Sequence, residues 1–379
     1  MSWNKKTIWN LTMALTALKE DILANTTICL LTVVALVLGG QGAYADFTFG
    51  TPTNLGPSVN SSLRDSGPCI SSDGLSLYFD SKRGGGSGAD DIWVTTRETV
   101  QDPWGEPVNL GPTVNSSSWD FGPMITANGL ELYFGSTRPG GYGAIDGWVT
   151  TRASVSEPWG EPVNLGSTVN SSAEDAGIVS ADGLSFIISS NRSGGYGGQD
   201  LWISTRPSLS DEWSEPVNLG PTVNSSAWDW DAELSADGLW LLFTSQRPGG
   251  LGGGELWLTT RETTNDPWST PMNLGAPVNS SSDDAFAGIS VDGSTLYFTS
   301  NRPGGQGSYD TWQAPIIPIV DLNNDGIVDA TDMCIIVDKW GTDDPLCDIG
   351  PMPWGDGIVD VQDLIVLAEH LFEEVPPVE

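Results

Sequence analysis

The sequence predicts an all-β protein built around a five-bladed β-propeller, and three observations carry this prediction. The triplet Asn-Leu-Gly recurs five times, at residues 54–56, 109–111, 164–166, 218–220 and 273–275. The intervals between copies are 55, 55, 54 and 55 residues, close to the period of propeller repeats. The 379 residues also include 46 Gly and 25 Pro, a composition that suits short strands joined by tight turns.

Each repeat is expected to form four strands, which is one propeller blade. In the first copy the expected strands lie at 68–71, 75–79, 91–96 and 106–110. The pair Asp73-Gly74 predicts a tight hairpin turn between the first two. The last copy lacks a fourth strand, whereas an extra strand-like segment at 47–55 precedes the first copy. We therefore expect the N-terminal strand to close the last blade and remove the open sheet edges.

The remaining segments divide the chain further. The expected segments are a signal peptide at 1–45, the propeller at 46–314, a linker at 315–320, a small calcium-binding domain at 321–375 and a tail at 376–379. The signal is predicted from Lys5 and Lys6, an apolar run at 28–38 and the small residues around Tyr44. An uncleaved N-terminal anchor is the alternative. Cleavage predicts a protein that is secreted, periplasmic or displayed on the cell surface, with no membrane segment afterwards. The C-terminal domain described below favours a bacterial origin.

Charge and histidine content exclude several functions. Asp and Glu number 49 against 15 Lys and Arg, a net charge of −34, so nucleic acids and anionic membranes are poor partners. Calcium suits such a chain better. The single histidine is His370, near the C-terminus. The first 320 residues therefore cannot use Ser-His-Asp, Cys-His or His-zinc chemistry.

The repeat resembles a known family. The pattern Ser-x-Asp-Gly-x-x-x-x-Phe, which begins at Ser71 and ends at Phe79, is followed by Asp-x-Trp at 91–93. These motifs resemble the WD40-like repeats of TolB-type β-propellers over about 270 residues. The resemblance implies the fold. It does not imply one function, because such propellers include binding proteins, scaffolds and enzymes.

Three polar residues recur in every copy. Arginines end the second strand, at Arg83, Arg138, Arg192, Arg247 and Arg302. Acids follow eight residues later, at Asp91, Asp146, Asp200, Glu255 and Asp310. We expect these two sets to pair and clamp the intervening Gly-rich loop; a ring of anion-binding arginines is the alternative. A second acidic ring precedes the first strands, at Asp65, Asp120, Asp175, Asp229 and Asp284. We expect it to order turns, with a calcium or ligand site as the alternative.

A ligand face is predicted where the repeat is broken. The candidate ligand-binding residues are Trp119, Tyr142, Tyr196, Trp228, Trp230, Asp231 and Glu233. Exposed aromatic rings beside carboxylates suit sugars, so we expect a carbohydrate or protein ligand and no catalysis. Packing of these aromatics between blades is the alternative for the residues. For the protein, the alternatives are a glycoside hydrolase on a five-bladed propeller and a structural scaffold.

The segment after the propeller contains a calcium-binding motif. Residues 321–332 read D-x-N-x-D-G-x-x-D-x-x-D, an EF-hand-like loop. The predicted ligands are Asp321, Asn323, Asp325, Ile327 through its carbonyl, Asp329 and Asp332. An apolar helix is expected to follow.

A second loop and helix follow, and together the two copies resemble a type I dockerin. The resemblance implies further calcium ligands at Asp356, Ile358, Asp360 and Asp363, and a cohesin-like protein that binds residues 321–375. The second copy departs from the pattern, because Met352 and Trp354 stand where ligands are expected. Asp348 is the candidate replacement if residues 350–353 loop out. Cys334 and Cys347 are candidates for a disulfide in an oxidising compartment.

Overall fold

The computed structural model describes residues 47–372, except 172–174, 181, 236–237, 262, 291, 324–326, 343, 345–346 and 351–357. The predicted signal peptide lies outside the described residues. The chain divides into two compact units, one of residues 50–291 and 295–315 and another that includes residues 47–49 and 316–372. In the described part of the chain, no helix is long and apolar enough to cross a membrane.

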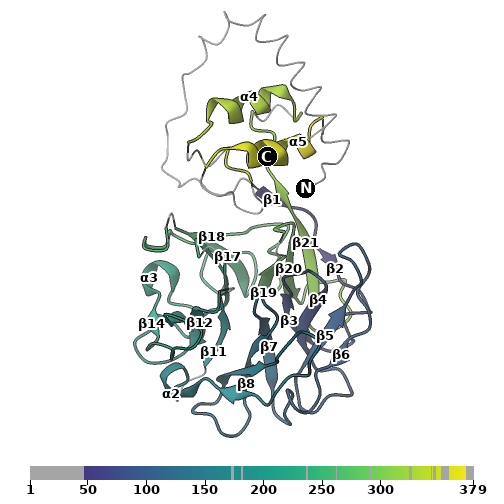
Figure 1. Ribbon diagram of the computed structural model, residues 1–379, viewed down its shortest axis with the longest axis vertical. Helices are drawn as coiled ribbons and strands as arrows, with labels where there is room; N and C mark the ends of the chain where they lie inside the picture. The colour runs from purple at the N-terminus through teal and green to yellow at the C-terminus, as the bar shows by residue number, and fades with distance from the viewer. Residues whose placement is uncertain are drawn as a thin grey trace, which may run out of the picture. The chain divides into compact units, whose positions relative to one another are not determined.

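The first unit is a β-propeller of five antiparallel sheets, as predicted (Figure 1). Blade 1 contains β3 (Asp65–Ile70), β4 (Ser76–Ser81), β5 (Asp91–Thr96) and β6 (Val108–Asn109). Blade 2 contains β7 (Asp120–Ile125), β8 (Glu131–Ser136), β9 (Asp146–Thr151) and β10 (Val163–Asn164). Blade 3 contains β11 (Asp175–Val179), β12 (Ser185–Ser190), β13 (Asp200–Thr205) and β14 (Val217–Asn218). Blade 4 contains β15 (Asp229–Leu234), β16 (Trp240–Ser245), β17 (Glu255–Thr260) and β18 (Met272–Asn273). The short helices α2 (Gly166–Val169) and α3 (Gly220–Val223) follow β10 and β14.

The fifth blade is closed by the N-terminal segment. It contains β19 (Asp284–Ile289), β20 (Thr295–Ser300), β21 (Asp310–Pro318) and β2 (Thr53–Asn54). Asn54 pairs with Trp312 of β21, in the register that joins Asn109 to Trp93 in blade 1. The predicted closure is therefore confirmed, and strand pairing links the two ends of the propeller sequence.

Apolar side chains of the second strands fill the contacts between blades. Leu77 and Phe79 of β4 are fully buried and pack with Tyr297 of blade 5, Trp93 and Trp104. Most repeated tryptophans serve such packing. The Arg97 guanidinium lies 4.2 Å from the centre of the Trp104 ring, and the same stacking recurs in three further blades. Tryptophans outside the repeat therefore stand out as candidates for function.

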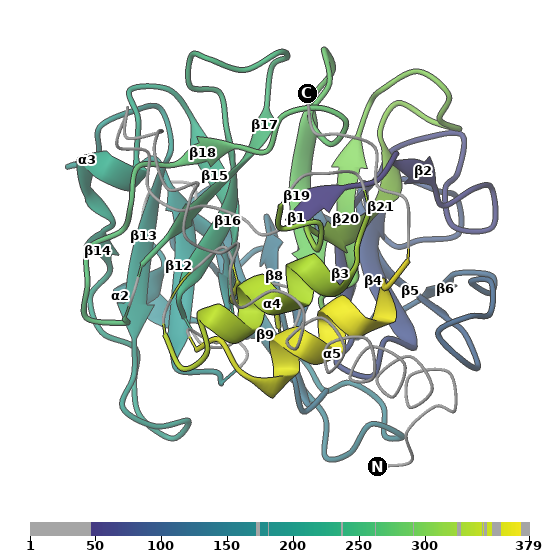
Figure 2. The same ribbon diagram turned by 90° about the horizontal axis from the view of Figure 1, so that it is seen from above.

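The second unit is small and largely helical. Its two long helices, α4 (Ala330–Asp338) and α5 (Val361–Glu369), pack side by side (Figures 1 and 2). Their buried faces share a core with Cys347, which is buried, whereas Cys334 is exposed. The described cysteines form no disulfide. Strand β1 (Phe47–Phe49) pairs with the last three residues of β21.

Candidate functional site

The elaborated loops of the propeller lie on one face. The Asp120 amide donates to the Asp90 carbonyl of the preceding blade at 2.9 Å, and Asp229 donates to Gln199 in the same way at 2.9 Å. In each case the bond joins two loops of adjacent blades. One loop precedes the first strand of a blade, and the other connects the second and third strands of the preceding blade. The Asp-Gly turns join the other ends of the strands and so lie on the opposite face. The face that carries these two sets of loops is the loop face of the propeller.

The repeated arginines pair with a different acid from the predicted one. Arg83 Nη2 lies 2.6 Å from Asp65 Oδ1. The same pair is formed by Arg138 and Asp120, Arg247 and Asp229, and Arg302 and Asp284. Strand register explains this pairing. Asp65, the first residue of β3, lies opposite Ser81, the last residue of β4, and Arg83 follows Ser81 by two residues. The predicted clamp between Arg83 and Asp91 is therefore wrong, and these guanidinium groups are already occupied by carboxylates.

The repeated acids whose side chains the structure describes stabilise loops. Asp65 Oδ2 accepts hydrogen bonds from the Ser61 amide at 2.5 Å and its hydroxyl at 2.8 Å, which confirms the predicted turn. Asp91 Oδ1 accepts from the Gly88 amide at 2.9 Å, and Oδ2 accepts from Asn109 Nδ2 at 3.0 Å. Since these repeated acids hold the fold, functional residues are better sought among those that break the repeat.

The first strands of four blades contain a β-bulge close to the propeller axis. The bulge residue has a positive φ, 62° at Gly67, 59° at Gly122, 49° at Asp231 and 51° at Phe286. Its amide donates to a side chain on the second strand of the preceding blade. The acceptors are Thr299 Oγ1 at 3.1 Å, Asp80 Oδ1 at 3.0 Å, Ser189 Oγ at 3.0 Å and Thr244 Oγ1 at 3.3 Å, respectively. Three of these acceptors are hydroxyl groups, and Asp80 replaces the fourth with a carboxylate.

Asp80 is the centre of a buried polar cluster. Its Oδ2 lies 2.8 Å from Arg64 Nη1, which also contacts Asp90 Oδ2 at 3.3 Å. Arg64 Nη2 donates to Ser66 Oγ at 3.1 Å. Burial raises the pKa of Asp80 to about 6, although the Arg64 guanidinium acts in the opposite direction. Burial also raises the pKa of Asp90, whose Oδ1 is buried and accepts no hydrogen bond from the described residues.

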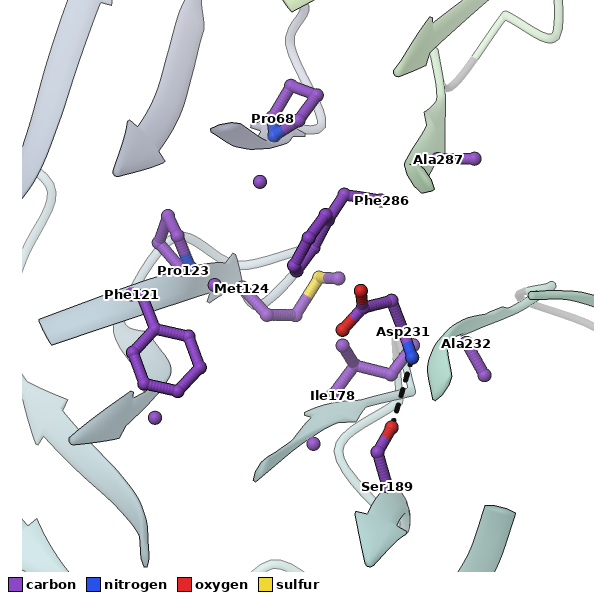
Figure 3. Close-up of a pocket in the computed structure, with 14 residues that line it drawn as sticks. Pro68, Phe121, Pro123, Met124, Ile178, Ser189, Asp231, Ala232, Phe286 and Ala287 are labelled. Atoms are coloured by element: carbon purple, nitrogen blue, oxygen red, sulfur yellow. Dashed lines mark hydrogen bonds between the residues drawn. The ribbon is translucent and has the colours of Figure 1, made fainter. Parts of the chain in front are cut away.

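A cavity lies on the axis beside this cluster, and Asp231 points into it (Figure 3). All five blades line it, mainly through apolar residues that include Phe121, Met124 and Phe286. Burial raises the pKa of Asp231 well above its usual range; Arg64 and a hydrogen bond with the Trp230 side chain oppose this shift, and Asp80 adds to it. Asp231 Oδ2 is buried and accepts no hydrogen bond from the described residues. The side chain is thus a carboxyl group with unused bonding capacity.

Glu233 lies in a second cavity, nearer the Asp-Gly turns, with Cys69 and Val179. Its Oε1 accepts a weak hydrogen bond from the Ile289 amide at 3.3 Å. Burial raises the pKa of Glu233 to about 8. The structure therefore places Asp231 and Glu233 in different cavities rather than together at one site.

The predicted aromatic residues are exposed on the loop face. Trp119 and Trp228 are each 49% exposed, and Tyr142 and Tyr196 are 55% and 52% exposed. Trp230 is partly buried and meets Trp228 edge to face at 6.4 Å. The Trp228 ring also lies against Gly198 of the preceding blade, so packing between blades covers part of it and leaves the rest open. Arg64 and Asp80 were not among the residues predicted to form this site. Arg64 departs from the repeat, because Trp119, Trp228 and Asp283 stand at its position in other blades. That departure could have identified it from the sequence.

The C-terminal unit positions several predicted calcium ligands. Asp332 is fully buried and accepts hydrogen bonds from the Asn323 amide at 3.1 Å and the Asp329 amide at 2.8 Å. Asp321 is also buried. Asp325 and Asp356 lie outside the described residues, and the described ones contain no group of three or more His, Cys, Asp or Glu arranged around a metal. Carboxylates closed over backbone amides fit an oxygen-ligated calcium site.

The second loop repeats this geometry with a shifted register. Asp363 accepts from the Gly350 amide at 2.8 Å and the Asp360 amide at 2.6 Å. Gly350 thus takes the place of Asn323, which gives Asp348 the place of Asp321. Asp348 is buried, like Asp321. Asp348 thus stands in the second loop where Asp321 stands in the first, whereas Met352 and Trp354 lie outside the described residues.

Comparisons with known proteins show similarity of fold. No protein-family model matches the chain, and no curated protein matches it. Among solved structures, TolB from Acinetobacter baumannii is similar at 12% identity and a TM-score of 0.39, over 66% of this chain and 54% of TolB. An α-L-arabinofuranosidase from Podospora anserina, solved with cellotriose, has 12% identity and a TM-score of 0.47, over 72% of this chain and 96% of that one. An endo-arabinase from Bacteroides thetaiotaomicron has 14% identity and a TM-score of 0.46, over 72% and 97%. The chain spans about half the length of TolB, and at these identities the similarity concerns the fold alone.

Proposed function

We propose that this protein is an exported, non-catalytic propeller that binds a carbohydrate or protein ligand on its loop face. The observation that carries the proposal is the set of exposed aromatic rings beside a buried polar cluster. Carbohydrate is the ligand class that this combination suits best, because a sugar offers an apolar ring face and a rim of hydroxyl groups.

The aromatic rings and the polar cluster adjoin one another. Trp119 lies in a loop that pairs with Asp90, and Asp90 contacts Arg64 at 3.3 Å. On another blade, Trp230 contacts Trp228 and directly precedes Asp231. A ligand that stacks on Trp119 or Trp228 would therefore have charged groups within reach of its hydroxyls.

The C-terminal unit is proposed to dock the propeller to a cohesin-like partner when calcium is bound. Its ligands would come from the loops around Asp332 and Asp363, with Asp348 contributing to the second. Calcium would supply a positive centre that holds these carboxylates together and so orders both loops. The role of α4 and α5 would then be to present the partner surface.

A glycoside hydrolase is the second candidate, favoured by the raised pKa values of Asp80 and Asp231. Glycoside hydrolysis needs one carboxyl group as an acid and a second as a base or nucleophile. Binding is preferred because Asp80 is held by Arg64 and by the Gly122 amide, which gives it a structural task.

The test compares aromatic variants for retention on immobilised polysaccharides in the presence of calcium. Trp119→Ala and Trp228→Ala should each weaken retention about tenfold, a typical loss for a stacking aromatic residue. Leu251→Ala is the matched control, because Leu251 is 61% exposed at the loop position of Tyr142 and Tyr196. Saturable binding that survives both tryptophan substitutions would reject the proposed face.

A further inference from the structure

We propose that the axial cavity is a binding site for an organic ammonium group, with Asp231 as its counter-ion. This inference deepens the proposed function and rests on the same loop face being the ligand face. It would make the propeller selective for ligands that carry a protonated amine.

The cavity has the size and lining of an ammonium pocket. Its volume is about 50 Å³, which is room for a small polar group. Phe121, Phe286 and Met124 form much of its wall. Aromatic faces attract organic cations, most strongly where water is excluded, and the thioether of methionine is polarizable. Figure 3 shows the Asp231 carboxylate among Met124, Ile178 and Phe286.

Asp231 stands at a position where other blades place residues without charge. Its φ of 49° is left-handed, a conformation that glycine adopts at the same bulge in blades 1 and 2. Aspartate tolerates this conformation, and the bulge directs its carboxyl side chain into a largely apolar cavity. Such placements occur at ligand sites, where function offsets the cost to stability.

No cation of the described chain pairs with this carboxyl group. Arg64, the guanidinium that acts on it, is committed to Asp80 at 2.8 Å and Asp90 at 3.3 Å. Lys82 acts on Asp90 and lies 5.8 Å from the Trp119 ring. Asp231 is thus left as a buried acid whose Oδ2 has no hydrogen-bond donor among the described residues.

An organic ammonium fits this arrangement better than a metal ion does. Calcium takes six to eight oxygen ligands, whereas the cavity offers one carboxyl group within a wall of carbon and sulfur atoms. The part of the chain that the structure describes holds no cluster of three acids there. An alkyl ammonium, by contrast, brings its own apolar surface.

The site should depend on pH. The charged groups that act on Asp231 are Arg64, which lowers its pKa, and Asp80, which raises it; Met124, Ile178 and Phe286 carry no charge. Burial raises the pKa of Asp231 and so favours the protonated form of the empty site, whereas a bound cation favours the charged form. Ammonium affinity should therefore increase as the pH rises towards the pKa of Asp231, and decrease in acid.

The experiment is calorimetric titration of the mature chain, residues 46–379, with two amines and their uncharged analogues at constant ionic strength. n-Butylammonium is compared with n-butanol, and glucosamine with glucose, so that the arms separate an amine on a flexible chain from one on a sugar ring. We expect millimolar binding of at least one amine and none of its uncharged analogue. Asp231→Asn should weaken that binding about tenfold or more.

Two further variants keep the result interpretable. Asp73→Asn removes one negative charge from a turn where blade 2 has Asn128, and should leave amine binding unchanged. Asp231→Gly restores the bulge residue of blades 1 and 2, so it should fold at least as stably as wild type and still lose amine binding. Binding of neither amine, equal binding of amine and uncharged analogue, or binding retained by both Asp231 variants would overturn the proposal. Such a failure leaves tryptophan-dependent polysaccharide retention unaffected, so the two proposals fail separately.

Discussion

The Arg64 guanidinium lies 2.8 Å from the Asp80 carboxylate at the propeller axis, where three other blades carry only a serine or threonine hydroxyl. Asp80 therefore does two things at once. It accepts the inter-blade hydrogen bond from Gly122 and fixes the guanidinium beside the cavity.

These two tasks can be separated by Asp80→Ser. Serine supplies the hydroxyl that the repeat uses and Arg64 keeps Asp90, so the loss of stability in urea should be smaller than the about 3–5 kcal/mol expected when a buried ion pair loses one partner. Arg64 would keep only Asp90 as an ion-pair partner, and ligand retention should fall. Unfolding curves and polysaccharide retention check this. A large loss of stability with unchanged retention would show that Asp80 serves the fold alone.

Glu233 predicts a pH-dependent stability. Its pKa is about 8 in the folded protein against 4.5 ordinarily, so the folded state holds this proton more tightly than the unfolded chain. Its contribution to stability is therefore complete below about pH 4.5 and lost as the pH rises to about 8. Glu233→Gln removes this loss and should be more stable than wild type near pH 8, by at least about 1.4 kcal/mol.

The measurement is urea unfolding of both proteins in acid and near pH 8, where the difference between them should widen. Asp102→Asn, an exposed change in a loop, is the control and should show no such widening. A constant difference between Glu233→Gln and wild type at both pH values would contradict the buried-acid account.

The revised arginine pairing also has a measurable consequence. Asp120 is fully buried and pairs with Arg138 at 2.6 Å, so Asp120→Ala leaves a largely buried guanidinium without its carboxylate. Removal of one partner from such a pair costs about 3–5 kcal/mol. Asp102→Ala, in an exposed loop, should cost less than about 0.5 kcal/mol. Similar urea midpoints for the two variants would argue against the pairing.

The second calcium loop is tested through Asp348. Calorimetric calcium titration of the mature chain should show two sites, and Asp348→Ala should weaken one about tenfold or more. Asp344→Ala is the control, because Asp344 pairs with Lys339 at 2.8 Å near the surface. Equal calcium binding by wild type and Asp348→Ala would show that Asp348 is not a calcium ligand of the second loop. Identical circular dichroism of residues 321–375 with calcium and with chelator would reject calcium-dependent ordering altogether.

The repeat made the propeller predictable, because strand period, turn chemistry and the missing fourth strand are local or strictly periodic signals. Contacts between side chains were harder to predict from the sequence. The eight-residue spacing of Arg83 and Asp91 suggested a pair, but strand register brings Asp65 closer, from 18 residues away. Sequence distance is a poor guide wherever a hairpin returns the chain to its start.

The axial site illustrates the same limit. Asp231 was a candidate because it breaks the repeat, yet its left-handed bulge and the separation from Glu233 depend on three-dimensional register. Arg64 and Asp80 also break the repeat. Their association across β3 and β4 was not visible in the spacing. In the C-terminal unit, Gly350 aligned with Asn323 only once the hydrogen bonds to the buried acids were known.

The central claim is binding without catalysis on the loop face. The most direct test incubates the mature chain, residues 46–379, with calcium and a panel of polysaccharides, and scores retention and released reducing ends in the same samples. We predict that at least one polysaccharide retains the protein while its reducing ends stay at the level of the blank. Release of reducing ends that Asp231→Asn abolishes would contradict the claim and make the protein a glycan hydrolase.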